Sequence, residues 1–131
     1  MKKKPTKNKK YQMEFAIKSS PIILFPFLST PSGMSEWFAD KVAVHHNQFV
    51  FTWDNVSEEA ELLEMIEEDV VRFRWKDHDK KEYFEFKITN TEITDDTILL
   101  ITDFAPEEDL DDEQQLWESQ VNELKSRLGG F

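Results

Sequence analysis

The residues of this sequence best suited to chemistry are three histidines and several groups of carboxylates. His45 and His46 are adjacent in a segment that alternates like a strand, which directs their side chains to opposite faces and away from a shared metal ion. His78 lies in a charged turn. The chain has no Cys, which excludes a disulfide, a thiolate nucleophile and a Cys-based zinc site. We therefore interpret the histidines as surface residues and predict neither a metal ion nor a cofactor.

Carboxylates gather in three acidic segments, at 58–61, 67–69 and 107–113. None contains the D-x-[DN]-x-[DN]-G pattern of a calcium loop, and 107–113 has no Gly to form the turn of such a loop. A solvated acidic surface and a helix N-terminus account for these segments better. The chain also lacks the G-x-S-x-G elbow of serine hydrolases. The sequence therefore predicts no calcium site and no catalytic residues.

Asp103 is the one charged residue in the otherwise apolar segment 99–105, "LLITDFA". A carboxylate in such a strand can face a cavity, with a raised pKa, and orient a ligand there. It can equally have a structural role, by accepting hydrogen bonds from the last helix or by pairing with Arg72 or Arg74. The sequence favours the structural role and leaves both open.

Length and charge place these residues in a single acidic domain. A chain of 131 residues, 39% hydrophobic and 13% aromatic, can enclose one core. Six lysines fall within residues 1–10, and the other 121 residues carry 10 basic and 27 acidic side chains. We predict a flexible basic tail over 1–10 and one domain over 11–131. A body this acidic repels phosphate groups, so nucleic acid is an unsuitable partner.

No targeting or membrane signal is recognisable. An amphipathic segment, not the apolar core of a signal peptide, follows the basic N-terminus. The longest apolar run, 22–28, is too short to cross a bilayer and contains Pro26. These observations predict a cytoplasmic protein without a membrane span.

The elements that must position these residues begin with a half-buried strand over 11–18, where apolar and polar residues alternate. Ser20-Pro21 and Thr30-Pro31 then repeat one device, an N-cap followed by Pro at the first helical position. We expect a short helix over 21–28 and a second one that carries Trp37 and Phe38. Two short helices in tandem form a corner.

From residue 41 the apolar residues recur with period two. The segment 58–68 is ambiguous, because its residues are good helix formers while its apolar positions fit neither period. We expect a strand, since a hairpin turn at 67–69 pairs it with the next strand, and a turn over 54–59 precedes it. The predicted strands are therefore 41–46, 48–53, 58–68, 69–76, 83–92 and 97–105.

The longest helix comes last, after residue 106. Its apolar stripe has helical spacing and consists of Leu110, Trp117, Val121, Leu124 and Leu128. Carboxylates open the helix, Lys125 and Arg127 lie in its last turn, and two glycines end it. A curved antiparallel sheet needs one face covered, and only this helix is long enough to cover it. The fold class is therefore α+β.

This order of elements resembles the helix-grip fold of the START-like (SRPBCC) superfamily, which includes the birch-pollen allergen and polyketide cyclase families. It is most similar to short bacterial START-like proteins related to activator domains of a chaperone ATPase. The similarity is carried by "SPIILFPFLSTPSGMSEWFAD" (20–40), "FVFTWD" (49–54), "VVRFRW" (70–75), "FEFKI" (84–88), "LLITDFA" (99–105) and "LWESQVNELKSRLG" (116–129). The resemblance implies a curved antiparallel sheet of about six or seven strands wrapped around the long helix. It also implies that 58–68 is a strand.

The resemblance further implies a cavity between the helix and the concave face of the sheet. The residues expected to line it are Phe25, Leu28, Trp37, Phe38, Phe51, Trp53, Phe73, Trp75, Phe84, Phe86, Asp103, Trp117, Val121 and Leu124. These aromatic residues are also numerous enough to fill the interior completely. In either case the Trp37-Phe38 pair lies at the open end, where it plugs the cavity or gates it.

Three functions remain, in descending order of support. The first is non-enzymatic binding of a small hydrophobic molecule, such as a fatty acid or other lipid. The second is a protein-interaction domain of the chaperone-activator type, whose acidic body would meet a basic partner. The third is a cyclase-like enzyme, which needs polar groups such as Asp103, Tyr83 and a histidine to converge in the cavity. The sequence does not indicate an oligomeric state.

Overall fold

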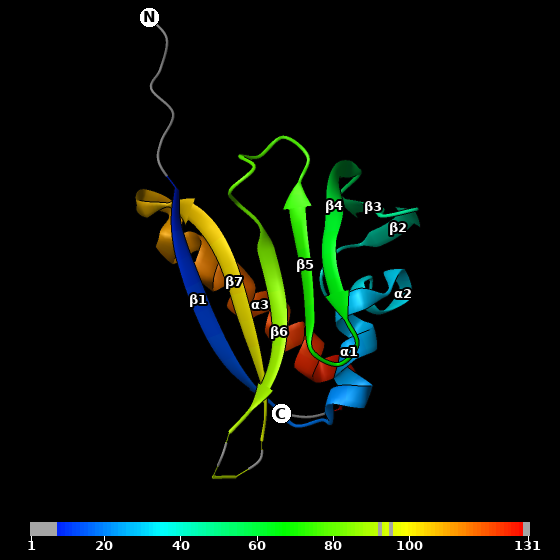
Figure 1. Ribbon diagram of the computed structural model, residues 1–131, viewed down its shortest axis with the longest axis vertical. Helices are drawn as coiled ribbons and strands as arrows, with labels where there is room; N and C mark the ends of the chain where they lie inside the picture. Colours follow the sequence, from blue (N-terminus) through cyan, green and yellow to red (C-terminus); the bar gives the residue numbers. More distant parts are fainter. Residues whose placement is uncertain (1–7, 92, 95, 130–131) are drawn as a thin grey trace, which may run out of the picture.

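In the described part of the chain, residues 8–91, 93–94 and 96–129 of the computed structural model, seven antiparallel strands form one sheet that curves around a long helix (Figure 1). The strands are β1 (Asn8–Ile17), β2 (Lys41–His45), β3 (Gln48–Trp53), β4 (Val56–Ile66), β5 (Val70–Trp75), β6 (Phe84–Asn90) and β7 (Thr97–Pro106). The helices are α1 (Pro21–Ser29), α2 (Pro31–Met34) and α3 (Leu110–Arg127), with a 3-10 turn, Glu107–Asp109, before α3. The predicted α+β helix-grip architecture is confirmed.

The strand order in the sheet is β1-β7-β6-β5-β4-β3-β2. The strands from β2 to β7 therefore pair with their neighbours along the chain, while β1 joins the far side and pairs with β7. In that pairing Tyr11 lies opposite Asp103. Strand β1 begins at Asn8, three residues before the predicted start, and residues 1–7 of the predicted tail lie outside the described residues.

The ambiguous segment is a strand, as predicted, and a β-bulge explains why its apolar residues fit no period. The register against β5 shifts between Leu62 and Glu64, so that Ala60 and Met65 both face the concave side although they are five positions apart in the sequence. An uninterrupted strand would place residues with this spacing on opposite faces. The extra residue at the bulge, Leu63, exchanges the two faces for the rest of β4.

The turn before β4 is shorter than predicted. Asp54 and Asn55 alone connect β3 to β4, with φ of 46° and 70°, and β4 already begins at Val56. Two consecutive residues with positive φ are typical of a type I′ hairpin turn, which Asn and Asp tolerate. The predicted turn over 54–59 therefore ends too late, and Glu58 belongs to the strand.

The corner after β1 has the predicted caps, but the second helix is shorter than predicted: α2 ends at Met34, so Trp37 and Phe38 lie in the turn after it. Ser20 Oγ accepts a hydrogen bond from Ile23 N (3.3 Å) at the start of α1, and Thr30 Oγ1 accepts one from Gly33 N (2.9 Å) at the start of α2. A Cβ atom on Gly33 would lie 2.1 Å from Pro26 O. The two short helices therefore pack so closely that only glycine fits at their contact.

Helix α3 crosses the concave face of the sheet (Figure 1). It buries Trp117, Val121 and Leu124, which is the predicted stripe at its centre, and Gly129, whose φ is 77°, follows its last turn. Carboxylates occupy its first turn and basic residues its last turn, so both ends complement the helix dipole. No helix in the described part of the chain is long and apolar enough to cross a membrane.

Candidate functional site

The interior between α3 and the sheet is largely filled with aromatic side chains. Phe51, Phe73 and Phe86 have no solvent exposure, and Phe51 meets the edge of Phe73 at a centroid distance of 5.8 Å. Eleven of the residues expected to line a cavity lie in this buried core, namely Phe25, Leu28, Trp37, Phe38, Phe51, Phe73, Phe84, Phe86, Trp117, Val121 and Leu124. The space that remains lies at one end of the interior.

This space is an open pocket of about 500 Å³ between the first half of α3 and the ends of five strands, and we call it the α3 pocket. The sheet supplies one residue from each strand from β3 to β7, in chain order Trp53, Glu58, Trp75, Phe84 and Asp103. Phe84 and Trp75 stack at 4.8 Å, and Trp53 lies 6.2 Å from Trp75. These rings form a continuous aromatic wall.

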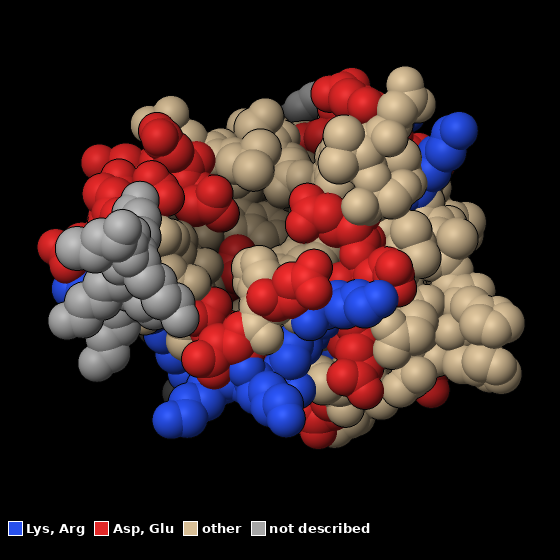
Figure 2. Space-filling view, turned by 90° about the horizontal axis from the view of Figure 1, so that it is seen from above, with Lys and Arg blue, Asp and Glu red and all other residues tan. Residues whose placement is uncertain are grey.

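Helix α3 supplies the opposite wall with residues from two successive turns, Glu113, Leu116, Trp117 and Gln120. Their spacings of three and four residues place them on one face of the helix. Leu116 is 54% exposed at the rim, whereas Trp117 is buried. Figure 2 looks onto the end of the molecule where the surface is hollowed between the sheet and the helix, with acidic side chains gathered around the hollow.

Phe38 closes the pocket from the side of the corner. Its ring stacks on Trp117 (5.8 Å) and on Phe84 (5.7 Å), and so joins the two walls. Its carbonyl oxygen accepts hydrogen bonds from Trp53 Nε1 (2.7 Å) and Gln120 Nε2 (2.9 Å). Trp37 is also buried, and its Nε1 donates to Phe27 O (2.7 Å). Both aromatic residues of the corner are therefore fixed in place as a plug.

Asp103 joins three elements and also lines the pocket. Its Oδ2 accepts hydrogen bonds from Trp117 Nε1 (3.1 Å) on α3 and from Tyr11 Oη (3.4 Å) on β1, and its Oδ1 accepts one from Phe104 N (2.8 Å). Trp117 Nε1 also donates to Tyr11 Oη (3.1 Å). The carboxylate thus accepts a hydrogen bond from the last helix, as the structural role predicts, and it also faces the pocket. A role in orienting a ligand stays a prediction.

The arginines named as alternative partners of Asp103 bind elsewhere. Arg72 Nε donates to Glu85 Oε2 (2.7 Å), and Arg74 Nε donates to Glu82 O (3.2 Å). The pKa of Asp103 is raised from 3.8 to about 6. Burial is the main cause and the nearby Glu113 adds to it, while the hydrogen bonds from Phe104 N, Trp117 and Tyr11 lower the pKa in part. Burial and Asp103 raise the pKa of Tyr11 too. The carboxylate therefore keeps an unbalanced negative charge at neutral pH.

Two further carboxylates, Glu58 and Glu113, line the same pocket. Burial raises the pKa of Glu113, and so do the neighbouring Asp109 and Asp112. No described residue on the lining of the α3 pocket is Lys, Arg or His. The electrostatic potential of the pocket is accordingly negative, and its own walls do not neutralise it.

Six of the fourteen expected residues line this pocket, namely Phe38, Trp53, Trp75, Phe84, Asp103 and Trp117. Four others were missed, and they are all polar or exposed: Glu58, Glu113, Leu116 and Gln120. For the three residues on α3 a sequence signal was present. Glu113 and Gln120 lie one helical turn before and after Trp117 of the apolar stripe, and Leu116 is adjacent to it. Glu58 gave no such signal, because the predicted turn over 54–59 included it, whereas β4 already begins at Val56.

The other polar residues considered from the sequence lie away from the pocket. Tyr83 packs its ring on Phe104 (5.3 Å) and beneath Arg72 (4.7 Å). The side chains of His45 and His46 are exposed, and their ring centroids lie 4.4 Å apart. The rings come together because His46 lies at a turn, with φ of 59°, and does not continue the strand. Their predicted separation onto opposite faces is therefore wrong. Among the described residues no group of three or more His, Asp or Glu side chains is arranged to hold a metal ion.

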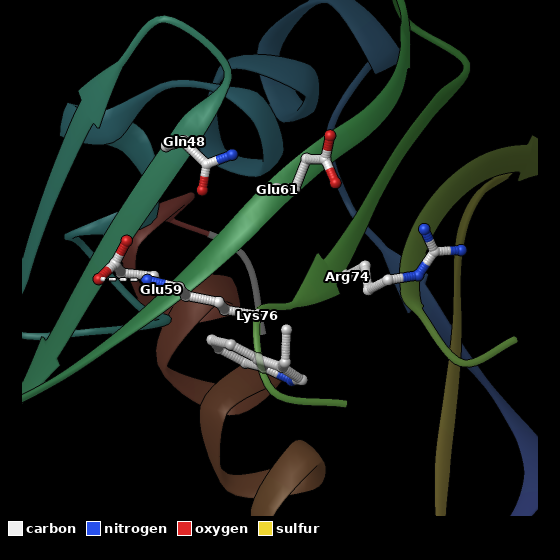
Figure 3. A pocket seen from close by; sticks show the side chains of 6 residues that line it. Gln48, Glu59, Glu61, Arg74 and Lys76 are labelled. Carbon is white, nitrogen blue, oxygen red and sulfur yellow. Dashed lines mark ion pairs between the residues drawn. The ribbon is translucent and has the colours of Figure 1, made fainter. Parts of the chain in front are cut away.

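Two other hollows differ from the α3 pocket because basic residues stand beside their acidic ones and form ion pairs with some of them. Figure 3 shows the first, of about 360 Å³ on the outer face of the sheet, where Lys76 Nζ lies 3.7 Å from Glu59 Oε2. In the second, beside the corner, Arg127 Nε lies 3.0 Å from Glu123 Oε2 and 3.7 Å from Glu36 Oε1. Hollows of this kind are ordinary polar surface.

Known structures share this architecture. The solution structure of BfR322 from Bacteroides fragilis is 36% identical, covers 95% of this chain and 93% of its own, and superposes with a TM-score of 0.66. The Aha1 dimer of Colwellia psychrerythraea is 14% identical, with 89% and 93% covered and a TM-score of 0.73. MLL2253 of Mesorhizobium loti is 20% identical, with 92% and 97% covered and a TM-score of 0.74. The last two similarities concern the fold alone.

No protein with a curated description matches this chain. A family model described as the START-like superfamily domain matches residues 5–130, nearly the whole chain. That match agrees with the curved sheet, the two short helices and the long α3 described above. The chain belongs to the START-like superfamily.

Proposed function

We propose that this protein binds a small hydrophobic molecule in the α3 pocket without converting it chemically. The observation that carries the proposal is the pocket itself, an open space of about 500 Å³ with aromatic walls beside an interior that is otherwise filled. Ligand sites in proteins are usually concave, mostly apolar and supplied with a few fixed polar groups. Asp103, Gln120 and the carbonyl group of Phe38 are fixed in this way by hydrogen bonds.

The described lining favours binding over catalysis. It includes carboxylates and one amide, and none of its described residues is a Ser, Thr, Lys or His that would act as a nucleophile or a neutral-pH base. Asp103 is already engaged by Trp117 and Tyr11. Cytoplasmic location, expected from the sequence, stays a prediction.

The four tryptophans allow a direct test by NMR. Trp53, Trp75 and Trp117 line the pocket, whereas Trp37 does not and serves as an internal control. Titration with 1-octanol, a small neutral amphiphile, should shift the indole N–H signals of the first three and leave that of Trp37 unchanged. Trp75→Leu should weaken binding severalfold, and Tyr83→Leu, which changes a partly exposed ring outside the pocket, should not.

Native and denatured masses of the protein purified from cells provide a second test. A discrete adduct that is lost on denaturation would support an occupied pocket, and its mass would indicate the class of ligand. If no indole signal moves with any apolar probe and the mass is bare, the binding proposal is wrong.

The protein-interaction alternative has one observation in its favour. Helix α1 exposes two adjacent isoleucines, Ile22 at 68% and Ile23 at 56%. Isolated exposed apolar residues are common on protein surfaces, so this patch ranks below the pocket. Cross-linking of the wild type to a partner that is lost in Ile22→Ser with Ile23→Ser, while 1-octanol leaves the indole signals unmoved, would favour the alternative.

A further inference from the structure

The α3 pocket combines aromatic walls with unneutralised carboxylates. Its aromatic walls, which include Trp53 and Trp75, provide apolar surface with electron-rich faces. Glu58, Asp103 and Glu113 stand among these rings, and no described lining residue carries a positive charge. A positively charged ligand would neutralise these carboxylates and supply the positive charge that the described lining of the pocket lacks.

The chemistry of such a ligand follows from both properties. An aromatic face attracts a cation through its quadrupole, and the attraction grows when the cation loses part of its water. A carboxylate attracts the same cation and repels an anion, and this effect is stronger in a partly enclosed site than in bulk water. A fatty acid would bring a fourth negative charge to the three carboxylates.

An inorganic cation fits the site less well than an organic one. No three carboxylates in the described residues are arranged to coordinate one metal ion. Rings such as Phe84, and the partly exposed side chain of Leu116, provide no oxygen ligands and suit an apolar body instead. An organic cation uses the aromatic and the acidic parts of the pocket together.

We propose that the ligand of the α3 pocket is an amphiphilic organic cation, a protonated amine or quaternary ammonium group attached to an apolar body. This inference rests on the proposed binding function and narrows it, since it excludes fatty acids and other anionic lipids as the preferred ligands. The cationic group lies among the carboxylates, and the apolar body contacts the tryptophan wall.

Three probes of equal chain length test the inference: octyltrimethylammonium, 1-octanol and octanoate, each below its micelle-forming concentration. The indole N–H signals of the wild-type protein report binding, with Trp37 as the internal reference. The cation should bind about tenfold more tightly than the neutral alcohol, the size of one sheltered cation–π contact or charge interaction. Octanoate should bind most weakly. Calcium chloride should not reproduce the shifts.

Paired variants locate the charge that matters. Asp103→Asn with Glu113→Gln should abolish most of the preference for the cation over 1-octanol. Asp111→Asn with Glu118→Gln removes two exposed charges of the same helix outside the pocket lining and should leave the preference intact. If the first pair impairs folding, Glu58→Gln with Glu113→Gln changes only the rim.

The outcomes separate the two proposals. If none of the three probes moves the pocket tryptophans, the binding function itself is wrong. If 1-octanol and octanoate bind as tightly as the cation, the function stands and the inference about charge is overturned. Equal loss of preference in the pocket variants and the control pair would also overturn it, because general attraction to an acidic protein would then explain the binding. Calcium-induced shifts of the same signals would reassign the site to a metal ion.

Discussion

Asp103 belongs both to a hydrogen-bond network that holds the fold together and to the lining of the α3 pocket. It links β1, β7 and α3 through Tyr11 and Trp117, and it is also part of the pocket wall. A carboxylate kept away from water without a basic partner costs free energy in its ionised form. Such a residue is retained where its charge or its hydrogen bonds serve a purpose, and here the hydrogen bonds fix α3 to the edge of the sheet.

The raised pKa of Asp103 predicts how stability depends on pH. Its pKa of about 6 in the folded protein exceeds the ordinary value of 3.8, so the folded state binds this proton more tightly than the unfolded state does. The contribution of Asp103 to stability therefore rises as the pH falls from 7 to 4, by about 2 kcal/mol. Relative to Asp103→Asn, which cannot titrate, the wild type should gain stability by that amount over this range.

Urea denaturation of both proteins at a series of pH values checks this prediction. The other carboxylates titrate in both proteins, so only the difference between the two curves is informative. Parallel curves between pH 7 and 4 would show that the pKa of Asp103 is not raised. Glu118→Gln, at an exposed site on α3, serves as a control and should give no such divergence.

At the scale of elements, the corner formed by α1 and α2 depends on the contact at Gly33. A Cβ atom there would lie 2.1 Å from Pro26 O and 2.7 Å from Phe27 Cα, both of which belong to the backbone. The two helices would have to separate to accept it. Because the same corner holds Trp37 and Phe38 in the core, the displacement would reach the wall of the α3 pocket.

Gly33→Ala should therefore destabilise the protein by roughly 2 kcal/mol, within the usual range for overpacking, although Ala is the better helix former. Ser32→Ala, the adjacent exposed position in α2, should change stability by less than about 0.5 kcal/mol. Thermal or urea denaturation measures both. A neutral or stabilising Gly33→Ala would mean that the helices are not in close contact.

At the scale of the whole molecule, charge is the dominant feature. The net charge is −11, and the acidic side chains gather around the mouth of the pocket (Figure 2). Some carboxylates are paired, such as Asp69 with Lys87 (2.7 Å) and Glu85 with Arg72 (2.6 Å), but acidic residues outnumber basic ones. Repulsion between the unpaired carboxylates opposes the compact state.

Salt should therefore stabilise this protein. Raising sodium chloride from about 0.05 M to 0.5 M shortens the Debye length and should raise the free energy of unfolding by roughly 1 kcal/mol. Urea, which is uncharged, is the suitable denaturant. Glu14→Lys with Glu118→Lys, two exposed positions, should reduce the response to salt. A loss of stability with added salt would mean that ion pairs outweigh the repulsion.

Local features of this protein followed from the sequence by itself, because neighbouring residues determine them. The caps at Ser20 and Thr30, the alternation in β3 and β5, and the buried stripe of α3 each depend on residues a few positions apart. The fold class followed as well, since one amphipathic helix must cover one curved sheet. The bulge at Leu63 was hidden, because it interrupts the period on which such predictions rest.

Only the tertiary structure decided the site. The aromatic residues predicted for a cavity are the same types that fill a core, and their packing alone determines which of them retain open space beside them. Phe51 is completely buried in the core, whereas Trp53 lines the α3 pocket, although both side chains lie on the same face of β3. Likewise Asp103 acquires its partners because β1 pairs with β7, an interaction across 92 residues that places Tyr11 opposite it. Contacts between residues so far apart in the sequence depend on the whole fold. They leave no periodicity or motif among the residues near Asp103 from which they could be predicted.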